Sequence, residues 1–491
     1  MRATARPFRA AILTVITLLT YGVTPTRAAA ATYVITWKTC PENEAVQCGT
    51  MRVPANWADP SGPTAMLTIA RRKAADPARR LGALLVNPGG PGGSAVDFTL
   101  GATQFFGEDL RARFDIVGMD PRGVGRSTPV LCSRDLVDAQ PDPLINSQRE
   151  YDATLAYNRK LAADCASRTG PVFPHVDTAS VVRDMDAVRA ALGEQKISFY
   201  GASYGTLMGQ QYAQLYPARL RALVLDSVMD HGAGLTRFLT EETDAAEDAF
   251  HQFVAWCTRD TQCILRGQDV TKVWANAVAR ARAGTLQNPY DPPKPLTLAE
   301  LIGAAFAAFY EPQWYSFAYY LRDALAAKPT ARKAPAPPVD LIDHSFPAVI
   351  CEDWHLPVTG LADLRRHLQA LAKRSPHMLI SPLALAAMTG CLGWPSPPDN
   401  PQRPGGPPPA TIPTLLVNSR HDPATAYAWS QRVVRQLGPK AALLTYDGWG
   451  HVIYNRSPCV AGAVDKYLTT LALPALGTTC PSVEPQPFGV G

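Results

Sequence analysis

The sequence lacks the ligand spacings of the common metal enzymes, because it contains neither C-x-x-C nor H-E-x-x-H. The nearest approach is Cys351 followed by His355, and no further ligand stands at a short spacing from that pair. Zinc sites take three or four protein ligands, so the sequence predicts no metal. The glycine-rich run at 87–94 is not followed by Gly-Lys-Ser/Thr, which excludes a phosphate-binding loop.

The chain also has little net charge. Its 47 Lys and Arg residues stand against 42 Asp and Glu residues, and four of the arginines fall within the first thirty positions. Nucleic-acid binding needs a concentrated basic face. We therefore expect no nucleic-acid partner.

Long apolar runs are absent except near the N-terminus. There, three arginines precede the stretch AAILTVITLL, and RAAA follows at 27–30. A basic start, a short apolar core and a small-residue end are typical of a secretory signal peptide, and such a run is too short to span a bilayer comfortably. We assign 1–30 as a signal peptide and expect a secreted, extracellular protein with no membrane contact after its removal.

The sequence does contain an even set of ten cysteines. In an exported chain this number favours disulfides over free thiols. Sequence does not determine the connectivity, but the clustering suggests that neighbours pair, as Cys40–Cys48, Cys132–Cys165, Cys257–Cys263, Cys351–Cys391 and Cys459–Cys480.

Short apolar segments alternate with helical ones in two parts of the chain. The pattern predicts strands at 64–72, 82–87, 114–120, 196–201, 220–228, 414–419 and 441–446, and helices at 178–192, 206–216, 426–437 and 461–472. Strands separated by helices form parallel sheets that are covered on both faces. The predicted fold class is therefore α/β with a mostly parallel sheet.

Between these two parts the sequence is mainly helical. Proline-rich stretches at 328–339 and 395–413 are expected to be loops or stiff connectors. The acidic helix at 241–248 is expected to face solvent. We divide the chain into the signal peptide, a first core part at 31–230, a helical insertion at 231–410 that lies over the core as a lid, and a final core part at 411–491.

The stretch Gly201-Ala202-Ser203-Tyr204-Gly205 lies between a predicted strand and a predicted helix. In G-x-S-x-G the serine sits on a sharp turn that exposes its hydroxyl, and the flanking glycines leave room for the backbone. The helix dipole favours negative charge that develops there. This context favours a nucleophilic Ser203 over an ordinary Gly/Ser turn.

A serine nucleophile needs a base, and in this type of fold the partners follow in the order Ser, acid, His. Asp422 directly follows the strand at 414–419, and among the nine histidines only His451 lies beyond it. We therefore predict a triad of Ser203, Asp422 and His451, with His451 as the base. Asp447 is too near His451 in the sequence to be the better acid.

The tetrahedral intermediate of acyl transfer needs two backbone donors. One is expected from Tyr204, the residue after the nucleophile, and the other from a loop after an early strand. The run NPGGPGGS at 87–94 suits that loop, and we predict the amide of Gly90 as its donor.

Five segments together, NPGGPGGS, DPRGVGRS, GASYGT, HDPAT and GWGH, resemble the secreted tripeptidyl aminopeptidases of actinobacteria. These are serine exopeptidases of the α/β-hydrolase fold, similar to proline iminopeptidases. The resemblance covers nearly the whole mature chain. It implies that short peptides are released from free N-termini through a serine ester, with the family's nucleophile, acid and base at Ser203, Asp422 and His451.

An aminopeptidase of this kind must recognise a free ammonium group, so a carboxylate should lie at a fixed distance from Ser203. Our sequence-based choice is Glu352 or Asp353 in the segment CEDW. A secreted esterase or lipase-like hydrolase would use the same triad and remains the alternative, whereas a non-catalytic binding protein would usually lack a triad member. Serine acyl transfer requires no cofactor, and we expect a monomer that acts on peptide or protein N-termini.

Overall fold

The computed structural model describes residues 33–290, 295–327, 340–403, 405–406 and 412–487. The predicted signal peptide at 1–30 and the proline-rich stretch at 328–339 lie outside these residues, as do parts of the second proline-rich stretch. Among the described residues, no helix has the length and apolar character needed to cross a bilayer.

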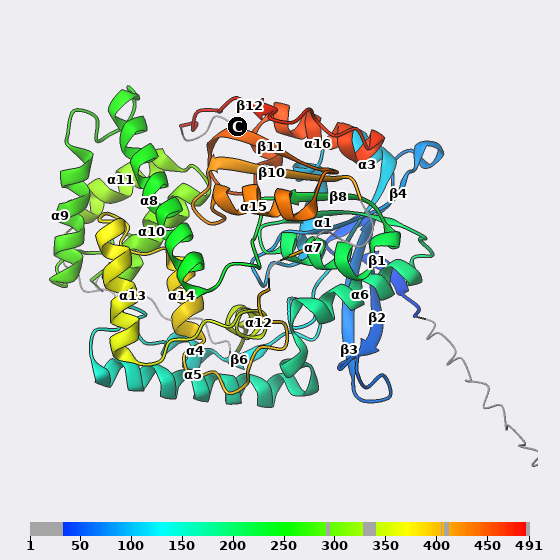
Figure 1. Cartoon of the computed structure of the whole chain (residues 1–491), viewed down its shortest axis with the longest axis horizontal. Coiled ribbons are helices and arrows are strands. Elements are labelled where there is room, and N and C mark those ends of the chain that lie inside the picture. The colour runs from blue at the N-terminus through cyan, green and yellow to red at the C-terminus, as the bar shows by residue number, and fades with distance from the viewer. Residues whose placement is uncertain (1–32, 291–294, 328–339, 404, 407–411, 488–491) are drawn as a thin grey trace, which may run out of the picture. The chain divides into compact units, whose positions relative to one another are not determined.

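Ten strands of the described chain form one sheet in the order β1-β2-β3-β5-β4-β7-β8-β10-β11-β12 (Figure 1). The first three are antiparallel, and β3 also pairs antiparallel with β5, whereas all pairs from β5 to β12 are parallel. The strands are β1 (Thr36–Cys40), β2 (Asn43–Pro54), β3 (Thr64–Arg72), β4 (Gly82–Asn87), β5 (Phe114–Met119), β7 (Ile197–Ala202), β8 (Leu220–Asp226), β10 (Thr414–His421), β11 (Ala441–Trp449) and β12 (Thr479–Cys480).

The central strands are buried on both faces, which explains their continuous apolar sequences. Every residue of β4, β5 and β7 is buried. Because side chains alternate along a strand, Leu84 and Val86 belong to one apolar core and Leu85, between them, belongs to the other. The predicted parallel α/β sheet is confirmed.

Helices cover both faces of the sheet. Apolar residues of α6, α7 and α15 join one core, and those of α3 and α16 join the core on the opposite face. The helices outside the insertion are α1 (Ala95–Leu100), α2 (Ala102–Phe105), α3 (Glu108–Arg113), α4 (Arg134–Asp138), α5 (Gln148–Thr169), α6 (Thr178–Ala191), α7 (Gly205–Leu215), α15 (Tyr427–Leu437) and α16 (Pro458–Thr470). This arrangement is that of the α/β-hydrolase fold.

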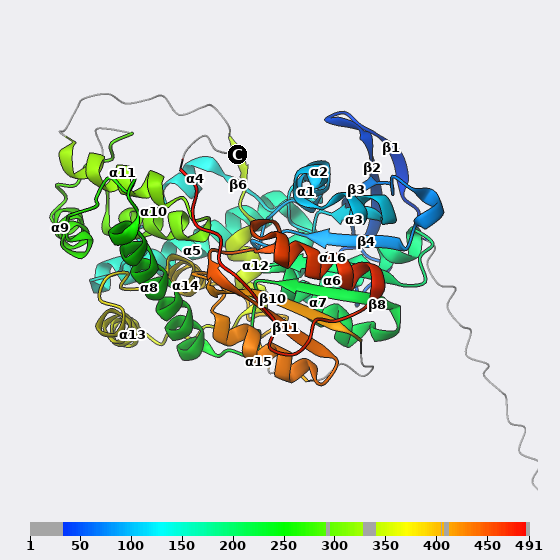
Figure 2. The same ribbon diagram turned by 90° about the horizontal axis from the view of Figure 1, so that it is seen from above.

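The chain between β8 and β10, here called the helical segment (227–413), is mainly helical as predicted. In both views its helices α8 to α11 gather at one end of the sheet (Figures 1 and 2). They enclose an aromatic core that includes Phe253, Trp256, Trp274 and Trp314. The helices are α8 (Leu235–Arg259), α9 (Val270–Arg282), α10 (Leu298–Tyr310), α11 (Trp314–Ala326), α12 (Ser345–Asp353), α13 (Leu361–Arg374) and α14 (Pro382–Gly390).

Two pairings of short strands were not predicted from the sequence. The hairpin of β1 and β2 extends the sheet at its antiparallel edge. Within the helical segment, β9 (Leu341–Asp343) pairs antiparallel with β6 (Leu131–Ser133), which comes from the first core part. These strands have three to twelve residues and mixed polarity, so their alternation is a weak sequence signal.

Five disulfides join neighbouring cysteines, which confirms the suggested pairing: Cys40–Cys48, Cys132–Cys165, Cys257–Cys263, Cys351–Cys391 and Cys459–Cys480. Several of them join different elements. The disulfide with the largest sequence separation, 40 residues, is Cys351–Cys391, which ties α12 to the residue that follows α14.

Candidate active site

Ser203 occupies the sharp turn between β7 and α7 in a strained conformation. Its φ is +54°, in the left-handed region that non-glycine residues rarely adopt. The flanking glycines are required by space, because a Cβ on Gly201 would lie 2.4 Å from the carbonyl oxygen of Gly205. A Cβ on Gly205 would lie 2.7 Å from the side-chain oxygen of Asn87. The local backbone therefore places the Ser203 hydroxyl at the carboxyl end of the sheet.

Asp422 and His451 come from the loops after β10 and β11, at the same end of the sheet. The Nδ1 atom of His451 lies 3.0 Å from both carboxylate oxygens of Asp422, and both side chains are fully buried. Burial by itself would raise the pKa of Asp422. The charge of His451 and the hydrogen bonds from His451, Thr425 and Ala424 outweigh burial and hold this pKa below its usual value. Asp422 is thus an ionised acceptor that orients the imidazole.

The loop that carries His451 is fixed by two neighbouring parts of the chain. The backbone amide of His451 donates to the carbonyl of Tyr310 at 2.8 Å. The buried carboxylate of Asp226 accepts from the amides of Ile453 and Tyr454 at 2.9 and 3.0 Å. With the ring held in this way, Nε2 of His451 has no hydrogen-bond partner among the described residues and is free to accept a proton.

The glycine loop after β4 lies directly against the nucleophile. A Cβ on Gly89 would lie 2.8 Å from both the Cβ of Ser203 and the amide nitrogen of Tyr204. The amide of Gly89 is already used, because it donates to Oδ1 of Asn87 at 2.9 Å. Within the described residues the amides of Gly90 and Tyr204 have no acceptor, so they are available to an oxyanion.

A small cavity of about 30 Å³ adjoins Ser203, Tyr204 and Gly90. Its remaining lining is apolar except for Thr425 and one carboxylate, Glu242 of α8. Glu242 is only 1% exposed; its Oε1 accepts from the hydroxyl of Ser381 at 3.1 Å, and its Oε2 has no partner among the described residues. Burial, followed by the nearby charge of Asp422, raises the pKa of Glu242 well above its usual value.

A larger cavity of about 550 Å³ lies on the His451 side of the site. Tyr310, at the end of α10, is part of its wall. The ring centroid of Tyr310 lies 4.3 Å from that of His451. Burial and then the charge of Asp422 raise the pKa of Tyr310, while its hydrogen bond with the Ser203 side chain lowers it. A protonated phenol therefore stands beside the nucleophile.

A family model and two curated relatives point to the same protein family. A family model described as "TAP-like protein" matches residues 375–480. The serine protease Hip1 of Mycobacterium tuberculosis is 30% identical over 88% of this chain and 87% of its own. The tripeptidyl aminopeptidase of Streptomyces coelicolor is 30% identical over 95% of this chain and 90% of its own. The chain belongs to the TAP-like family of serine hydrolases.

Other relatives of this TAP-like hydrolase carry a different activity in their names. Carboxylesterase B of Mycobacterium tuberculosis is 32% identical over 90% of this chain and 89% of its own. Among solved structures, an alpha/beta hydrolase from a deep-sea metagenome library aligns at 12% identity and a TM-score of 0.37, over 82% of this chain and 93% of that one. That overlap is too loose to inform the site.

The two carboxylates that we chose from the sequence do not face the site of this TAP-like hydrolase. Asp353 is fully buried and accepts from the amide of Thr178 at 2.8 Å, the hydroxyl of Tyr204 at 2.6 Å and the side chain of Asn400 at 2.7 Å. Burial, followed by the charge of Asp177, raises the pKa of Asp353 to about 6. It is a structural acceptor beneath the nucleophile turn.

Glu352 also differs from the expectation. It accepts from the hydroxyl of Ser396 at 3.1 Å and from the amide of Asp399 at 3.3 Å, and burial raises its pKa to about 7. Neither Glu352 nor Asp353 lines the two cavities beside the triad. The expectation that one of them meets the substrate is therefore corrected, because both already serve as acceptors in the packing of α12.

Sequence reasoning missed Glu242 and Tyr310 of the TAP-like hydrolase. The prediction that the acidic run 241–248 faces solvent is wrong at Glu242 and Glu247, which are 1% and 7% exposed. A signal was present, because Glu242 lies four residues from both Phe238 and Ala246 on the apolar stripe of α8. Tyr310 left no such signal, because it ends an apolar helix in which aromatic residues are common.

Proposed function

We propose that this serine hydrolase is a secreted aminopeptidase, which releases tripeptides or other short peptides from free N-termini. One observation carries the proposal: the buried carboxylate of Glu242, whose Oε2 has no hydrogen-bond partner among the described residues, lines the same small cavity as Ser203. A carboxylate so deeply buried is unfavourable when ionised, unless a cation pairs with it.

The chemistry follows from the triad geometry. The hydroxyl of Ser203 attacks the scissile carbonyl while Nε2 of His451 takes the proton, and Asp422 stabilises the imidazolium that forms. The amides of Gly90 and Tyr204 donate to the oxyanion. His451 then protonates the leaving amine, and a water molecule activated by the same histidine hydrolyses the Ser203 ester.

Glu242 supplies the recognition of the free N-terminus. Without a ligand its raised pKa keeps it protonated, so no uncompensated charge is buried. A substrate ammonium beside Oε2 would favour the ionised form and complete an ion pair in a site without water screening. An acetylated N-terminus carries no charge and keeps only one N–H donor, so it cannot form this ion pair. The cavity of about 30 Å³ holds one group about the size of an ammonium, so a tripeptide acyl group can lie between Ser203 and Glu242 only when the helical segment opens.

We further propose that the helical segment acts as the lid. It contributes Glu242 on one side of the nucleophile and Tyr310 on the other. Substrate selection would then reside in the helical segment and bond cleavage in the loops of the sheet. The five disulfides support secretion, because such bonds persist in oxidising compartments outside the cytoplasm.

An ester hydrolase with the same triad is the second candidate. It is supported by the mostly apolar lining of the cavity at Ser203 and by the relative named carboxylesterase B. For such an enzyme Glu242 would remain protonated throughout turnover. Its substrates would need no amino group.

The deciding experiment compares three chromogenic substrates on the mature protein: a tripeptide anilide with a free amine, its N-acetylated form, and a short-chain nitrophenyl ester. The aminopeptidase proposal expects cleavage of the first and not of the second. Single-residue and dipeptide anilides of the same series measure the preferred length. Ser203→Ala provides the background and should abolish all turnover while the thermal unfolding stays close to that of the wild type.

Turnover of the ester alone would refute the aminopeptidase and leave the ester hydrolase. Activity of Ser203→Ala near that of the wild type would refute both proposals, because both depend on the same nucleophile.

A further inference from the structure

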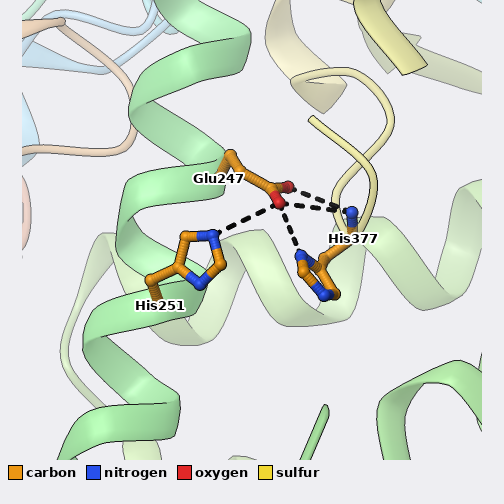
Figure 3. A group of neighbouring side chains, drawn as sticks. All are labelled: Glu247, His251 and His377. Carbon is orange, nitrogen blue, oxygen red and sulfur yellow. Dashed lines mark hydrogen bonds and ion pairs between the residues drawn. The ribbon is translucent and has the colours of Figure 1, made fainter. Parts of the chain in front are cut away.

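Away from the catalytic centre, three side chains with metal-binding atoms converge on one point (Figure 3). Glu247 and His251 lie one turn apart on α8, and His377 lies in the turn between α13 and α14. Each side chain offers one donor atom, and the three atoms lie within 4.8 Å of one another. His377 is 130 positions from Glu247, so no short ligand spacing marks this group in the sequence.

The carboxylate of Glu247 is fixed in an orientation that presents one oxygen to both imidazoles. Its Oε2 accepts from the backbone amides of His377 and Met378 at 3.2 and 2.8 Å. Its Oε1 lies 2.6 Å from Nδ1 of His377 and 3.5 Å from Nε2 of His251. Carboxylates that bind metals are commonly held by hydrogen bonds of this kind to the oxygen that does not face the ion.

The ring of His377 is also held in place. It stacks on Phe250, with ring centroids 4.7 Å apart and an angle of 17° between the planes. The indole of Trp274 donates to the backbone carbonyl of His377 at 3.0 Å. Two of the three donors are therefore preorganised, which lowers the entropy lost on binding an ion.

His251 completes the group from the solvent side. Its side chain is 56% exposed, whereas that of Glu247 is 9% exposed. A solvent-facing ligand gives an ion a path of entry and leaves a coordination position for water. It can also turn toward the other two ligands without disturbing the core.

We propose that Glu247 Oε1, His251 Nε2 and His377 Nδ1 bind one divalent transition-metal ion, Zn²⁺ foremost, with water in the fourth position. Two imidazoles and one carboxylate form a ligand set that suits zinc, whereas Mg²⁺ and Ca²⁺ prefer oxygen ligands alone. On binding, Nδ1 of His377 gives its proton to solvent and Nε2 takes one up, so the ring remains a neutral imidazole, and the metal replaces the hydrogen bond between His377 and Glu247. No other co-reactant is needed.

Such an ion would link Glu247 and His251 of α8 to His377 in the turn that precedes α14. The same turn continues to Ser381, which donates to Glu242 of α8 at 3.1 Å. The metal site and Glu242 therefore lie on one helix and share one facing segment. The role is structural: it holds together two elements of the helical segment, and it does not depend on the proposed aminopeptidase activity.

The test is a Zn²⁺ titration of the chelator-treated mature protein by calorimetry, with Co²⁺ absorption spectra to report the coordination. One ion per chain is expected, with a rise of the melting temperature on addition of Zn²⁺. His251→Ala should weaken binding by more than about 100-fold, because a ligand is lost outright. His251 is exposed, so this variant should fold, and its melting temperature without metal checks that it does.

His355→Ala is the matched control, because His355 is also exposed on the helical segment and its side chain lies outside the cluster. It should keep the affinity of the wild type. Equal Zn²⁺ affinity in His251→Ala and the wild type would overturn the proposal. So would the absence of a one-to-one complex at a Zn²⁺ concentration of about 1 mM, because a site with three ligands binds far more tightly than a single surface histidine.

Discussion

If the protein is the aminopeptidase proposed above, Glu242→Gln should remove its preference for substrates with a free N-terminus. The amide has the shape of the carboxyl group and can still accept from Ser381, so packing at the cavity is conserved. Only the ability to form an ion pair with a substrate ammonium is lost. The measured quantity is the ratio of kcat/KM for the free-amine tripeptide anilide to kcat/KM for the nitrophenyl ester.

The magnitude follows from the burial of the group. Removing one partner of a buried, hydrogen-bonded charge pair costs about 2–5 kcal/mol, or about 30-fold to about 4,000-fold in kcat/KM. Glu242 is 1% exposed, so solvent screening does not reduce this range. The net free energy of the ion pair in the wild type is smaller, because the carboxyl of Glu242 has a raised pKa and must first be ionised. We therefore expect the ratio to fall by about 100-fold, in the lower part of that range.

Glu241→Gln is the matched control, one residue earlier on the same helix. The carboxylate of Glu241 pairs with Arg432 and accepts from the indole of Trp429 at 2.8 Å. Trp429 lines the small cavity, but Glu241 does not, and a glutamine at 241 can still accept from the indole. This variant should keep the substrate ratio of the wild type. A ratio in Glu242→Gln within about threefold of the wild type would refute the reasoning, because a buried pair cannot contribute so little.

Three further outcomes are expected. Because the pKa of Glu242 is raised in the folded state, the wild type loses stability as the pH rises above the usual glutamate range. The melting temperature of Glu242→Gln should therefore rise relative to that of the wild type between pH 4 and pH 8. A constant difference in melting temperature would contradict the raised pKa. Tyr310→Phe should lower kcat by up to about tenfold with little change in KM, since one hydrogen bond at Ser203 is lost and the ring at His451 remains; an unchanged kcat would exclude this role. Replacing Cys351 and Cys391 together by alanine opens a 40-residue loop and should lower the free energy of unfolding by about 4 kcal/mol, measured by denaturant titration; an unchanged value would show that the link contributes nothing.

The sheet could be predicted because its strands carry a physical signal that few other structures produce. Every residue of β4, β5 and β7 is buried and most are apolar, because both faces of these strands are covered. The predicted bounds of β3 and β4 agree with the structure at both ends. The pairing of β6 with β9 could not be predicted, because each has three residues and the two lie far apart in the sequence.

The placement of Ser203, Asp422 and His451 followed from the same regularity. Each residue lies within two positions of the end of a mostly buried strand, and parallel strands end at one edge of the sheet. The proximity of the three side chains could therefore be predicted from the order of the strands in the sequence. The local glycine pattern at 201–205 added the turn that only glycine permits at both flanks.

The order of the strands does not predict Glu242, the group that we propose to bind the substrate ammonium, because this residue lies in the inserted helical segment. Glu352 follows Cys351, whose disulfide was expected to hold this acid in place beside the site. In the structure, α12 directs Glu352 toward Ser396 instead. Glu242 was overlooked because acids on helices are usually exposed. Its burial arises from helix packing, since α8 turns its apolar stripe toward the core and Glu242 lies on that stripe. The order of the strands determines where the proposed triad lies. The packing of α8 determines that the carboxylate of Glu242 lies beside it. A buried carboxylate on the apolar face of an inserted helix is therefore the feature to seek in structures of related proteins, because the hydrogen bond from Ser381 engages one oxygen of Glu242 and the other has no partner among the described residues.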